Sequence, residues 1–424
     1  MVDEWEPSLR VGVVMSSRHY LETVIELHPT DVAHGGEAVA RVDGKAHFVD
    51  GAMPGERVLG EVVKETASWA RVELREIVAP SAQRVDPPCR HFGTCGGCQW
   101  QFADYPAQLK WKQSILAGQL SHLGRIAEPP VRPTVAVGSE YGYRNRVDLE
   151  VSDGRPAFHR RRSHDLEPIA ECLLLHPVLA DLFDRLGDLG EMRRLTLRCA
   201  TTTGKALAVI TGTVPAGVAS WGCVVSHRSR GELRPVVGSG TIVETVSELP
   251  LRITGDAFFQ NNTPGAEVLV GLVREALSPH ENDTVLDAYA GGGMFGLTVG
   301  RDAGGVIAVE SDPLAVQDLL FNAAAAGSDH LVVEATVEEA IPEINDPWDI
   351  AVVDPPRDGL GVKAVAAITS AKPRAIAYVS CDPASLARDC RYLADVGYRL
   401  DWATPVDMFP QTFHIETVAA FSAG

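Results

Sequence analysis

The sequence predicts an α/β protein whose C-terminal part is a doubly wound, mostly parallel sheet. After about Leu251, buried apolar runs alternate with helical, Ala-rich stretches, the pattern of a parallel sheet with helices on both faces. Between about Glu22 and Val78, five short alternating runs are separated by Gly, Asp and Pro, as in a small β-barrel. The mixed, strand-rich stretch between these parts predicts an inserted α+β domain.

The predicted barrel occupies residues 1–80 and includes a short leader. Its expected strands lie in VIELHP, AVARVDG, KAHFVDG, ERVLGEVV and WARVELREIV. A glycine pair at 35–36 and a Met-Pro-Gly corner at 53–55 fit the turns. This pattern is typical of oligonucleotide-binding (OB) barrels, although any other small barrel without a ligand would show it as well.

Three further segments complete the predicted organisation. Residues 81–125 hold a proline-stiffened linker, a cysteine-rich loop and a helix expected over Tyr105–Leu123, where apolar residues recur at helical spacing. Residues 126–250 form the α+β domain, and residues 251–424 form the doubly wound sheet. Ligands of such sheets bind at the carboxyl ends of the strands, so binding and catalytic residues are expected there.

Composition predicts a cytoplasmic protein with no membrane partner. The start, MVDEWEPSLR, carries acids and lacks the apolar stretch of a secretory signal. The most apolar run, near Ala206–Val225, is broken by glycines and a proline, which favours core strands over a membrane span. We expect a monomer.

The net charge of −18 argues against a protein that holds nucleic acid mainly by a large basic surface. A local basic groove is still compatible with an acidic body. The stretch Tyr143–His164 is the candidate, with six arginines at 144, 146, 155, 160, 161 and 162. A solvated charged face would explain the same stretch equally well.

A glycine-rich turn follows the strand VLDA and opens a helix, in Asp287–Gly296. Glycines let the backbone approach a ligand closely, and the helix N-terminus favours an anionic group. Glu310 ends the next strand, about twenty residues on, where an acid can bind ribose hydroxyls. The pair fits NAD and S-adenosylmethionine (SAM) about equally.

The segment DIAVVDPPRDG places Asp354, two prolines and Arg357 at the end of a later strand. Two prolines after a buried strand make a rigid exit, poor in hydrogen-bond donors, that can wall a flat base. Such exits are typical of methyltransferases acting on planar targets, and this favours SAM. A bare turn after a strand is the alternative.

Cys381 ends the following strand, in AIAYVSCDPASLARD. A thiolate there can add to carbon 6 of a uracil, which makes carbon 5 nucleophilic enough to attack a methyl sulfonium. A lone cysteine is more often a small buried hydrophobe, but its place in register with the two preceding motifs favours the nucleophile. Cys390, nine residues later in a helix, is expected in the core.

Glu416 heads the last strand, in FPQTFHIETVAAF, and could remove the carbon-5 proton after methylation. An exposed edge-strand glutamate would give the same pattern. His414 shares a strand face with Glu416 and competes for the role.

Three cysteines within ten residues, Cys89, Cys95 and Cys98, indicate a metal site, because a reduced cytosolic chain has little use for disulfides. Zinc commonly takes paired CxxC motifs, whereas only one is present, and this favours a [4Fe–4S] cluster. Cys172 is the expected fourth ligand, with Cys199 and Cys223 as rivals.

The motifs together resemble the RNA uracil-5 methyltransferase family, in its iron–sulfur branch that modifies 23S ribosomal RNA. The likeness covers nearly the whole chain. It rests on PPCRHFGTCGGCQWQ, YRNRV, HRRRSHDLEPIAECLLLHP, FFQNN, DAYAGGG, DPPRDG, YVSCDPASLARD and MFPQTFHIE in that order. It implies a class I SAM-dependent methyltransferase fold and RNA as the partner. It also implies that the barrel over residues 1–80, of the TRAM type, and the central α+β domain over residues 126–250 both bind RNA.

Carried over residue by residue, the resemblance implies the following roles. Cys381 is the nucleophile and Glu416 the base. The SAM contacts are Gln260, Tyr289, Glu310 and Asp354, and the cluster ligands are Cys89, Cys95, Cys98 and Cys172. Arg144 and Arg160–Arg162 face the RNA.

Two residues depart from the family pattern. Met294 stands where the glycine loop usually has asparagine, which predicts the loss of one polar SAM contact. Asp382 replaces the usual asparagine after the nucleophile, and an added acid should disfavour the thiolate. Neither departure removes a catalytic group, so we expect an active enzyme.

Three other functions remain open at this point. A transfer-RNA T-loop methyltransferase would carry the same motifs. An amino-methyltransferase acting on guanine or adenine would not need Cys381. A non-catalytic RNA-binding iron–sulfur protein, with a decayed methyltransferase fold, would explain Met294 and Asp382.

Overall fold

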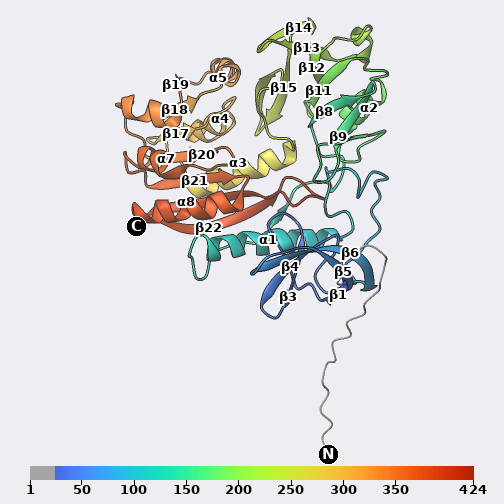
Figure 1. Ribbon diagram of the computed structural model, residues 1–424. Coiled ribbons are helices and arrows are strands. Elements are labelled where there is room, and N and C mark those ends of the chain that lie inside the picture. The colour runs from blue at the N-terminus through green and yellow to red at the C-terminus, as the bar shows by residue number, and fades with distance from the viewer. Residues whose placement is uncertain (1–23) are drawn as a thin grey trace, which may run out of the picture.

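The computed structural model describes residues 24–424 and confirms the α/β class (Figure 1). Its strands form a six-stranded sheet, a seven-stranded sheet, a hairpin and an eight-stranded sheet. The predicted leader lies outside the described residues. In the described part, no helix is long and apolar enough to cross a membrane.

The N-terminal sheet has six strands in the order β1-β5-β6-β4-β3-β2, one more than predicted because Asp31–Val32 forms a short extra strand. Its elements are β1 Val24–Leu27, β2 Asp31–Val32, β3 Ala38–Val42, β4 Lys45–Asp50, β5 Arg57–Glu65 and β6 Trp69–Ala79. Register shifts along β5 and β6 bend the long pair, and β1 returns to contact β3. The inner face buries apolar side chains such as Leu27, Val49 and Val72.

Helix α1, Tyr105–His122, joins this sheet to the C-terminal fold. Asp104 caps it by accepting a hydrogen bond from the Ala107 amide, and a proline occupies its first turn. The helix packs against α8 and β22, and Figure 1 shows it lying between the N-terminal sheet and the C-terminal layers. Its Leu116 and Leu120 belong to the core of the C-terminal fold, although the sequence placed the helix in a separate segment.

The central sheet has the order β10-β9-β8-β11-β12-β13-β14 and is antiparallel except for the β12–β13 pair. Its strands are β8 Arg146–Ser152, β9 Arg155–His159, β10 Leu166–Pro168, β11 Met192–Cys199, β12 Ala206–Gly212, β13 Val224–Ser229 and β14 Glu232–Val237. Helix α2, Pro177–Asp184, covers one face with Leu179, Leu182 and Phe183. The hairpin β15 Thr241–Val246 and β16 Leu249–Thr254 spans the predicted border at 250 and packs on α3 and α5.

The eight-stranded sheet has the order β19-β18-β17-β20-β21-β23-β22-β7. Its strands are β7 Val135–Ala136, β17 Thr284–Ala288, β18 Gly305–Glu310, β19 His330–Glu334, β20 Ile350–Val353, β21 Ala375–Ser380, β22 Tyr398–Asp407 and β23 Glu416–Ala423. The first five strands in this order are parallel, and β23 is antiparallel to both β21 and β22. The order reverses at β17, so a ligand crevice is expected beyond its carboxyl end.

Helices cover both faces of this sheet, as predicted. Apolar residues of α3 Thr263–Leu277, α4 Met294–Val299 and α5 Pro313–Ala326 pack into the core on one face. Those of α6 Val337–Ala340, α7 Gly361–Ile368, α8 Pro383–Asp395 and α1 pack on the other. The buried strands are rich in Val, Ile and Ala on both faces, as a sheet covered on both sides requires.

A fully buried ion pair connects α1 to the end of β22. The Lys112 ammonium donates to Asp407 at 2.5 Å and to the carbonyl of Phe409 at 3.1 Å, and both charged side chains are 0% exposed. Burial lowers the pKa of Lys112, and the carboxylate opposes that shift. The pair therefore fixes where the segment after Asp407 leaves the sheet.

Replacing Lys112 by Met should lower the unfolding free energy by about 3 kcal/mol, because Asp407 would stay buried without its countercharge. The double variant K112M/D407L should recover most of that loss, since neither charge remains. Urea unfolding followed by tryptophan fluorescence measures both. A single variant as stable as the wild type would contradict this role for the pair.

Candidate active site

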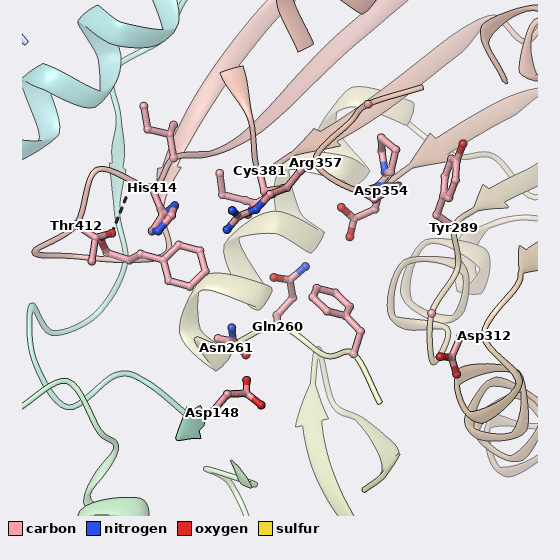
Figure 2. A pocket seen from close by; sticks show the side chains of 18 of the residues that line it. Asp148, Gln260, Asn261, Tyr289, Asp312, Asp354, Arg357, Cys381, Thr412 and His414 are labelled. Atoms are coloured by element: carbon pink, nitrogen blue, oxygen red, sulfur yellow. Dashed lines mark hydrogen bonds between the residues drawn. The ribbon is translucent and has the colours of Figure 1, made fainter. Parts of the chain in front are cut away.

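A cavity of about 1250 Å³ lies at the carboxyl ends of β17, β18, β20 and β21. All six residues implied for catalysis and SAM binding line it: Gln260, Tyr289, Glu310, Asp354, Cys381 and Glu416. Figure 2 shows Tyr289 and Asp312 at one end and Thr412 and His414 at the other, with Asp354, Gln260 and Cys381 between them. One continuous space thus joins the glycine loop to the candidate nucleophile.

Two carboxylates fix the conformation of the glycine loop by accepting hydrogen bonds from backbone amides. Glu310 accepts hydrogen bonds from the amides of Gly291 at 2.8 Å and Ser311 at 2.7 Å. Asp287 is buried behind the loop and accepts from the Gly296 amide at 2.7 Å. Its second oxygen has no partner among the described residues, and burial raises the pKa of Asp287 to about 7. Asp287 begins the glycine-rich motif in the sequence, but the sequence alone does not indicate a role for it.

Gln260 reaches the cavity from the segment before α3. The backbone carbonyl of Gln260 accepts from the Asn145 side chain at 3.1 Å, and Asn262 caps α3 by accepting from the Gly265 amide. These bonds hold the FFQNN segment against the central sheet. In Figure 2 the Gln260 amide points into the space shared with Asp354 and Cys381.

Cys381 and Glu416 are neighbours because of strand register. In the antiparallel β21–β23 pair, Ser380 lies opposite Thr417, so the next residue of β21 lies beside the first residue of β23. Glu416 is 4% exposed, and Cys381 is half-buried at the cavity wall. The exposed-edge interpretation of Glu416 is therefore wrong: it is a buried carboxyl beside the thiol.

The cavity disfavours negative charge on the thiol of the free protein. Burial raises the pKa of Cys381 to about 12, and the carboxylates of Glu416, Asp354 and Asp382 add to the shift. Burial, followed by the charge of Asp354, raises the pKa of Glu416 well above its usual range. Arg357 opposes both shifts, and in Figure 2 its guanidinium lies beside Cys381.

His414 is unsuited to hold a proton here. Burial and the nearby charge of Arg357 lower its pKa to about 4. Its backbone amide donates to the Thr412 hydroxyl at 3.3 Å. At neutral pH the ring is therefore uncharged and a weak base.

The loop from Phe409 to Ile415, which forms one wall of the cavity, is anchored by Gln411. The Gln411 amide donates to Gln108 at 2.9 Å, and the Gln108 side chain donates back to Gln411 at 3.0 Å. The amides of Gln99 and Trp100 donate to the Gln411 carbonyl. The loop is therefore tied to α1 and to the residues that follow Cys98.

The DPPRDG loop is anchored from behind by Asp389 on α8, a role that sequence reasoning missed. Asp389 is fully buried and accepts from the Leu360 amide at 2.6 Å and from the Tyr378 hydroxyl at 2.9 Å. Gly359 has a positive φ of 74°, and a Cβ there would collide with the Asp389 carboxylate. The end of the motif YVSCDPASLARD thus fixes the loop that carries Arg357.

Met294 and Asp382, the two residues that depart from the family pattern, lie in different environments. Met294 is 7% exposed, belongs to the core against the sheet, and is not among the residues that line the cavity. Asp382 caps α8 through the Ser385 amide at 2.7 Å and lies 3.5 Å from His34 of the N-terminal sheet. Its charge raises the pKa of Cys381 as expected, but by less than burial, Glu416 or Asp354.

The four cysteines expected as cluster ligands, Cys89, Cys95, Cys98 and Cys172, line one small separate cavity. The rivals do not: Cys199 and Cys223 lie in the core of the central sheet. Within residues 24–424, no three His, Cys, Asp or Glu side chains are arranged to hold a metal ion.

The arginines of the basic stretch line the large cavity but are engaged with acids. Arg160 pairs with Glu167 at 2.9 Å, and Arg161 pairs with Asp50. Arg162 lies 2.8 Å from Glu37. Two of these three arginines therefore bind the N-terminal sheet to the central sheet at the mouth of the cavity.

Comparison with known proteins identifies the family that this chain resembles. The sequence model described as tRNA (uracil-5-)-methyltransferase matches residues 242–422. The chain is 35% identical to an uncharacterized RNA methyltransferase of Gloeobacter violaceus, over 92% of this chain and 94% of that protein. It is 34% identical to one of Streptomyces coelicolor, over 94% and 92%.

The chain belongs to the RNA uracil-5 methyltransferase family. It is a SAM-dependent RNA methyltransferase, and its fold is the class I methyltransferase fold. The chain is similar to a solved structure, that of Pyrococcus abyssi tRNA (uracil-54, C5)-methyltransferase in complex with S-adenosyl-L-homocysteine. The structural match spans 94% of this chain and 100% of that protein. The TM-score is 0.76 at 25% identity.

Alkylation of this methyltransferase by iodoacetamide should report the charge balance around Cys381, because only the thiolate reacts. With a pKa of about 12, labelling of Cys381 should rise about tenfold per pH unit from pH 7 to 9. Glu416→Gln should speed labelling by removing a carboxylate, and Arg357→Gln should slow it. Mass spectrometry of the Cys381 peptide gives the rates.

Cys390, which is 4% exposed, provides the internal control and should stay unlabelled. Rates that are equal in both variants and the wild type would show that neither side chain acts on the thiol.

Proposed function

We propose that the enzyme methylates carbon 5 of a uridine in 23S ribosomal RNA through a covalent bond between Cys381 and carbon 6. The observation that carries this is the adjacency of a thiol and a buried carboxyl across β21 and β23, within the cavity that also contains the glycine loop. An amino-methyltransferase would have no use for that thiol. The decayed-fold alternative does not explain why all six implied residues still line one cavity.

The proposed reaction uses each of these side chains once. The Cys381 thiol loses its proton to the water of the open cavity, and its sulfur adds to carbon 6 while Arg357 offsets the negative charge. Carbon 5 then becomes the nucleophile, and SAM supplies the electrophilic methyl group. Glu416 removes the carbon-5 proton, the carbon 6–sulfur bond breaks, and the sulfur leaves as thiolate.

The raised pKa of Glu416 suits this step, because a carboxylate with a higher pKa is a stronger base. For SAM we propose Gln260, Tyr289, Glu310 and Asp354 as contacts, with Glu310 placed for the ribose hydroxyls.

Ribosomal RNA is proposed as the substrate because the cysteine motif resembles the iron–sulfur branch of the family. A transfer-RNA uridine is the second candidate, favoured by the Pyrococcus abyssi tRNA methyltransferase that spans nearly the whole chain. Mapping 5-methyluridine across total RNA from a strain lacking the gene separates them. A lost site in 23S rRNA supports the proposal, and a lost T-loop site supports the alternative.

We also propose a [4Fe–4S] cluster on Cys89, Cys95, Cys98 and Cys172. These residues supply four thiols from two distant segments to one small cavity, and four thiolates are the ligand set that a cubane takes. When bound, such a cluster would cross-link the cysteine loop to the segment before α2. Zinc is the alternative ligand of the same thiols.

Protein purified without oxygen should be brown and contain about four irons per chain, as a four-cysteine cubane requires. Cys172→Ser should lose the colour, whereas the matched control Cys223→Ser should keep it, because Cys223 lies outside the small cavity. Iron analysis and the visible spectrum measure this. One zinc per chain and a colourless protein would exclude the cluster.

Removing the nucleophile or the base should stop the reaction at different points. Cys381→Ala should bind RNA without bonding to it. Glu416→Gln keeps the shape but cannot take the carbon-5 proton, so the methylated ring cannot expel the sulfur and a covalent protein–RNA adduct should accumulate. Denaturing electrophoresis with RNA from the gene-deleted strain detects the adduct.

The double variant C381A/E416Q should form no adduct. His414→Ala is the matched control and should turn over, because the low pKa of His414 makes it a poor base. Normal turnover by Glu416→Gln would assign the proton to another acceptor, and an adduct in Cys381→Ala would show that the nucleophile is misassigned.

A further inference from the structure

A second hollow lies on the central sheet, at the end where β11 begins and β12 and β13 end. Its volume is about 550 Å³. It is lined by Arg193, Thr211, Gly212, His227, Arg228, Ser229, Arg230 and Gly231. No carboxylate of the described chain lines this notch, which is unusual for a protein with a net charge of −18.

Two backbone irregularities direct arginines toward the notch. Arg193 is the extra residue of a β-bulge in β11, because Met192 pairs with Gly212 and Arg194 pairs with Thr211. Bulges commonly redirect a side chain.

Arg230 and Gly231 form the two-residue turn between β13 and β14, with φ angles of 52° and 84°. Turns of this kind favour Asn-Gly, because both residues need a positive φ. An arginine there is conformationally costly, and such costs concentrate at functional positions. The chain thus carries an exposed guanidinium where local structure would favour a smaller residue.

Two of the three arginines that line the notch are open to a ligand. Within residues 24–424, Arg193 and Arg230 have no ion-pair partner, unlike the three arginines at the cavity mouth. Glu232, the nearest acid along the chain, is paired with Arg234. The hydroxyls of Thr211 and Ser229 add hydrogen-bond donors, so the notch has the donor set that recognises a phosphate group.

The notch adjoins the wall of the active-site cavity. Arg228 lines the notch and pairs with Asp256. Asp256 lies two residues before Phe258, which lines the cavity and is 62% exposed. The Arg228–Asp256 ion pair therefore links the notch to the cavity wall that carries Phe258.

We propose that this notch binds the phosphodiester backbone of the substrate RNA, a short distance along the strand from the target uridine. The proposal rests on RNA being the substrate, but not on which RNA carries the target. Arg193 and Arg230 contact phosphate oxygens and release counterions as they do so. They strengthen RNA binding and take no part in methyl transfer.

The test compares R193A/R230A with R185A/R399A. The control removes the same charge from residues that line neither the cavity nor the notch, and its exposed arginines are already paired with Asp181 and Asp401. The probes are poly(U), which can span the cavity and the notch, and a uridine trinucleotide, which fills only the cavity. Affinities are measured from 0.05 to about 1 M salt, where phosphate contacts fade.

R193A/R230A should bind poly(U) about tenfold or more weakly near 0.1 M salt, and its salt slope should fall by about 1.4, for two single-strand phosphate contacts. Binding of the trinucleotide and of SAM should not change, and KM for RNA should rise with kcat unaltered. R193K/R230K should restore most of the slope, because lysine also neutralises phosphate.

Equal salt slopes for the notch variant, the control and the wild type would overturn the proposal while leaving the methylation assignment intact. So would loss of trinucleotide binding in parallel with poly(U), because that indicates a general structural change. A wild-type enzyme that binds poly(U) with the expected slope, but forms no 5-methyluridine in any cellular RNA, would instead refute the proposed function alone.

Discussion

The antiparallel pairing of β23 with β21 is the constraint on which the active site depends. In a fully parallel sheet, every strand would bring its carboxyl end to the ligand edge, and the first residue of a strand would lie at the far side. Reversing β23 brings its first residue, Glu416, to that same edge, opposite the end of β21 where Cys381 lies. A carboxyl encoded at the start of a strand, the proposed base, thereby meets a thiol encoded at the end of one, the proposed nucleophile.

That arrangement is stabilised in part by segments that precede the methyltransferase sheet in the sequence. The wall between Asp407 and Glu416 is fixed by Lys112, by Gln108 and by the amides that follow Cys98. The loop before β3 adds Gly36, which packs against Phe413 and accepts through its carbonyl a hydrogen bond from the buried Trp100 indole. The N-terminal segments thus position the cavity wall as well as extending the surface.

Local sequence patterns were enough to predict the site residues that lie at the ends of strands. Features that depend on how distant strands pair could not be predicted in this way. Asp354 and Cys381 follow apolar runs directly, so the sequence placed them at one edge of the sheet. The register of β21 against β23 leaves no local signal, and for this reason Glu416 could not be told from an edge residue. Similarly, Asp50 and Arg161 pair across 111 residues, and the bulge at Arg193 exists only once β11 and β12 are aligned.

The acids around Cys381 have a consequence for the order of the proposed steps. The charge of Glu416 raises the pKa of Cys381, and such coupling is mutual, so two negative charges beside one another are disfavoured. A thiolate at Cys381 is therefore least disfavoured while the Glu416 carboxyl carries its proton. Once the sulfur is bonded to carbon 6 it is a neutral thioether, and its repulsion of the carboxylate ends. In the proposed reaction, forming the adduct thus removes one of the charges that oppose ionisation of Glu416, while burial and Asp354 keep its pKa raised and its carboxylate a strong base.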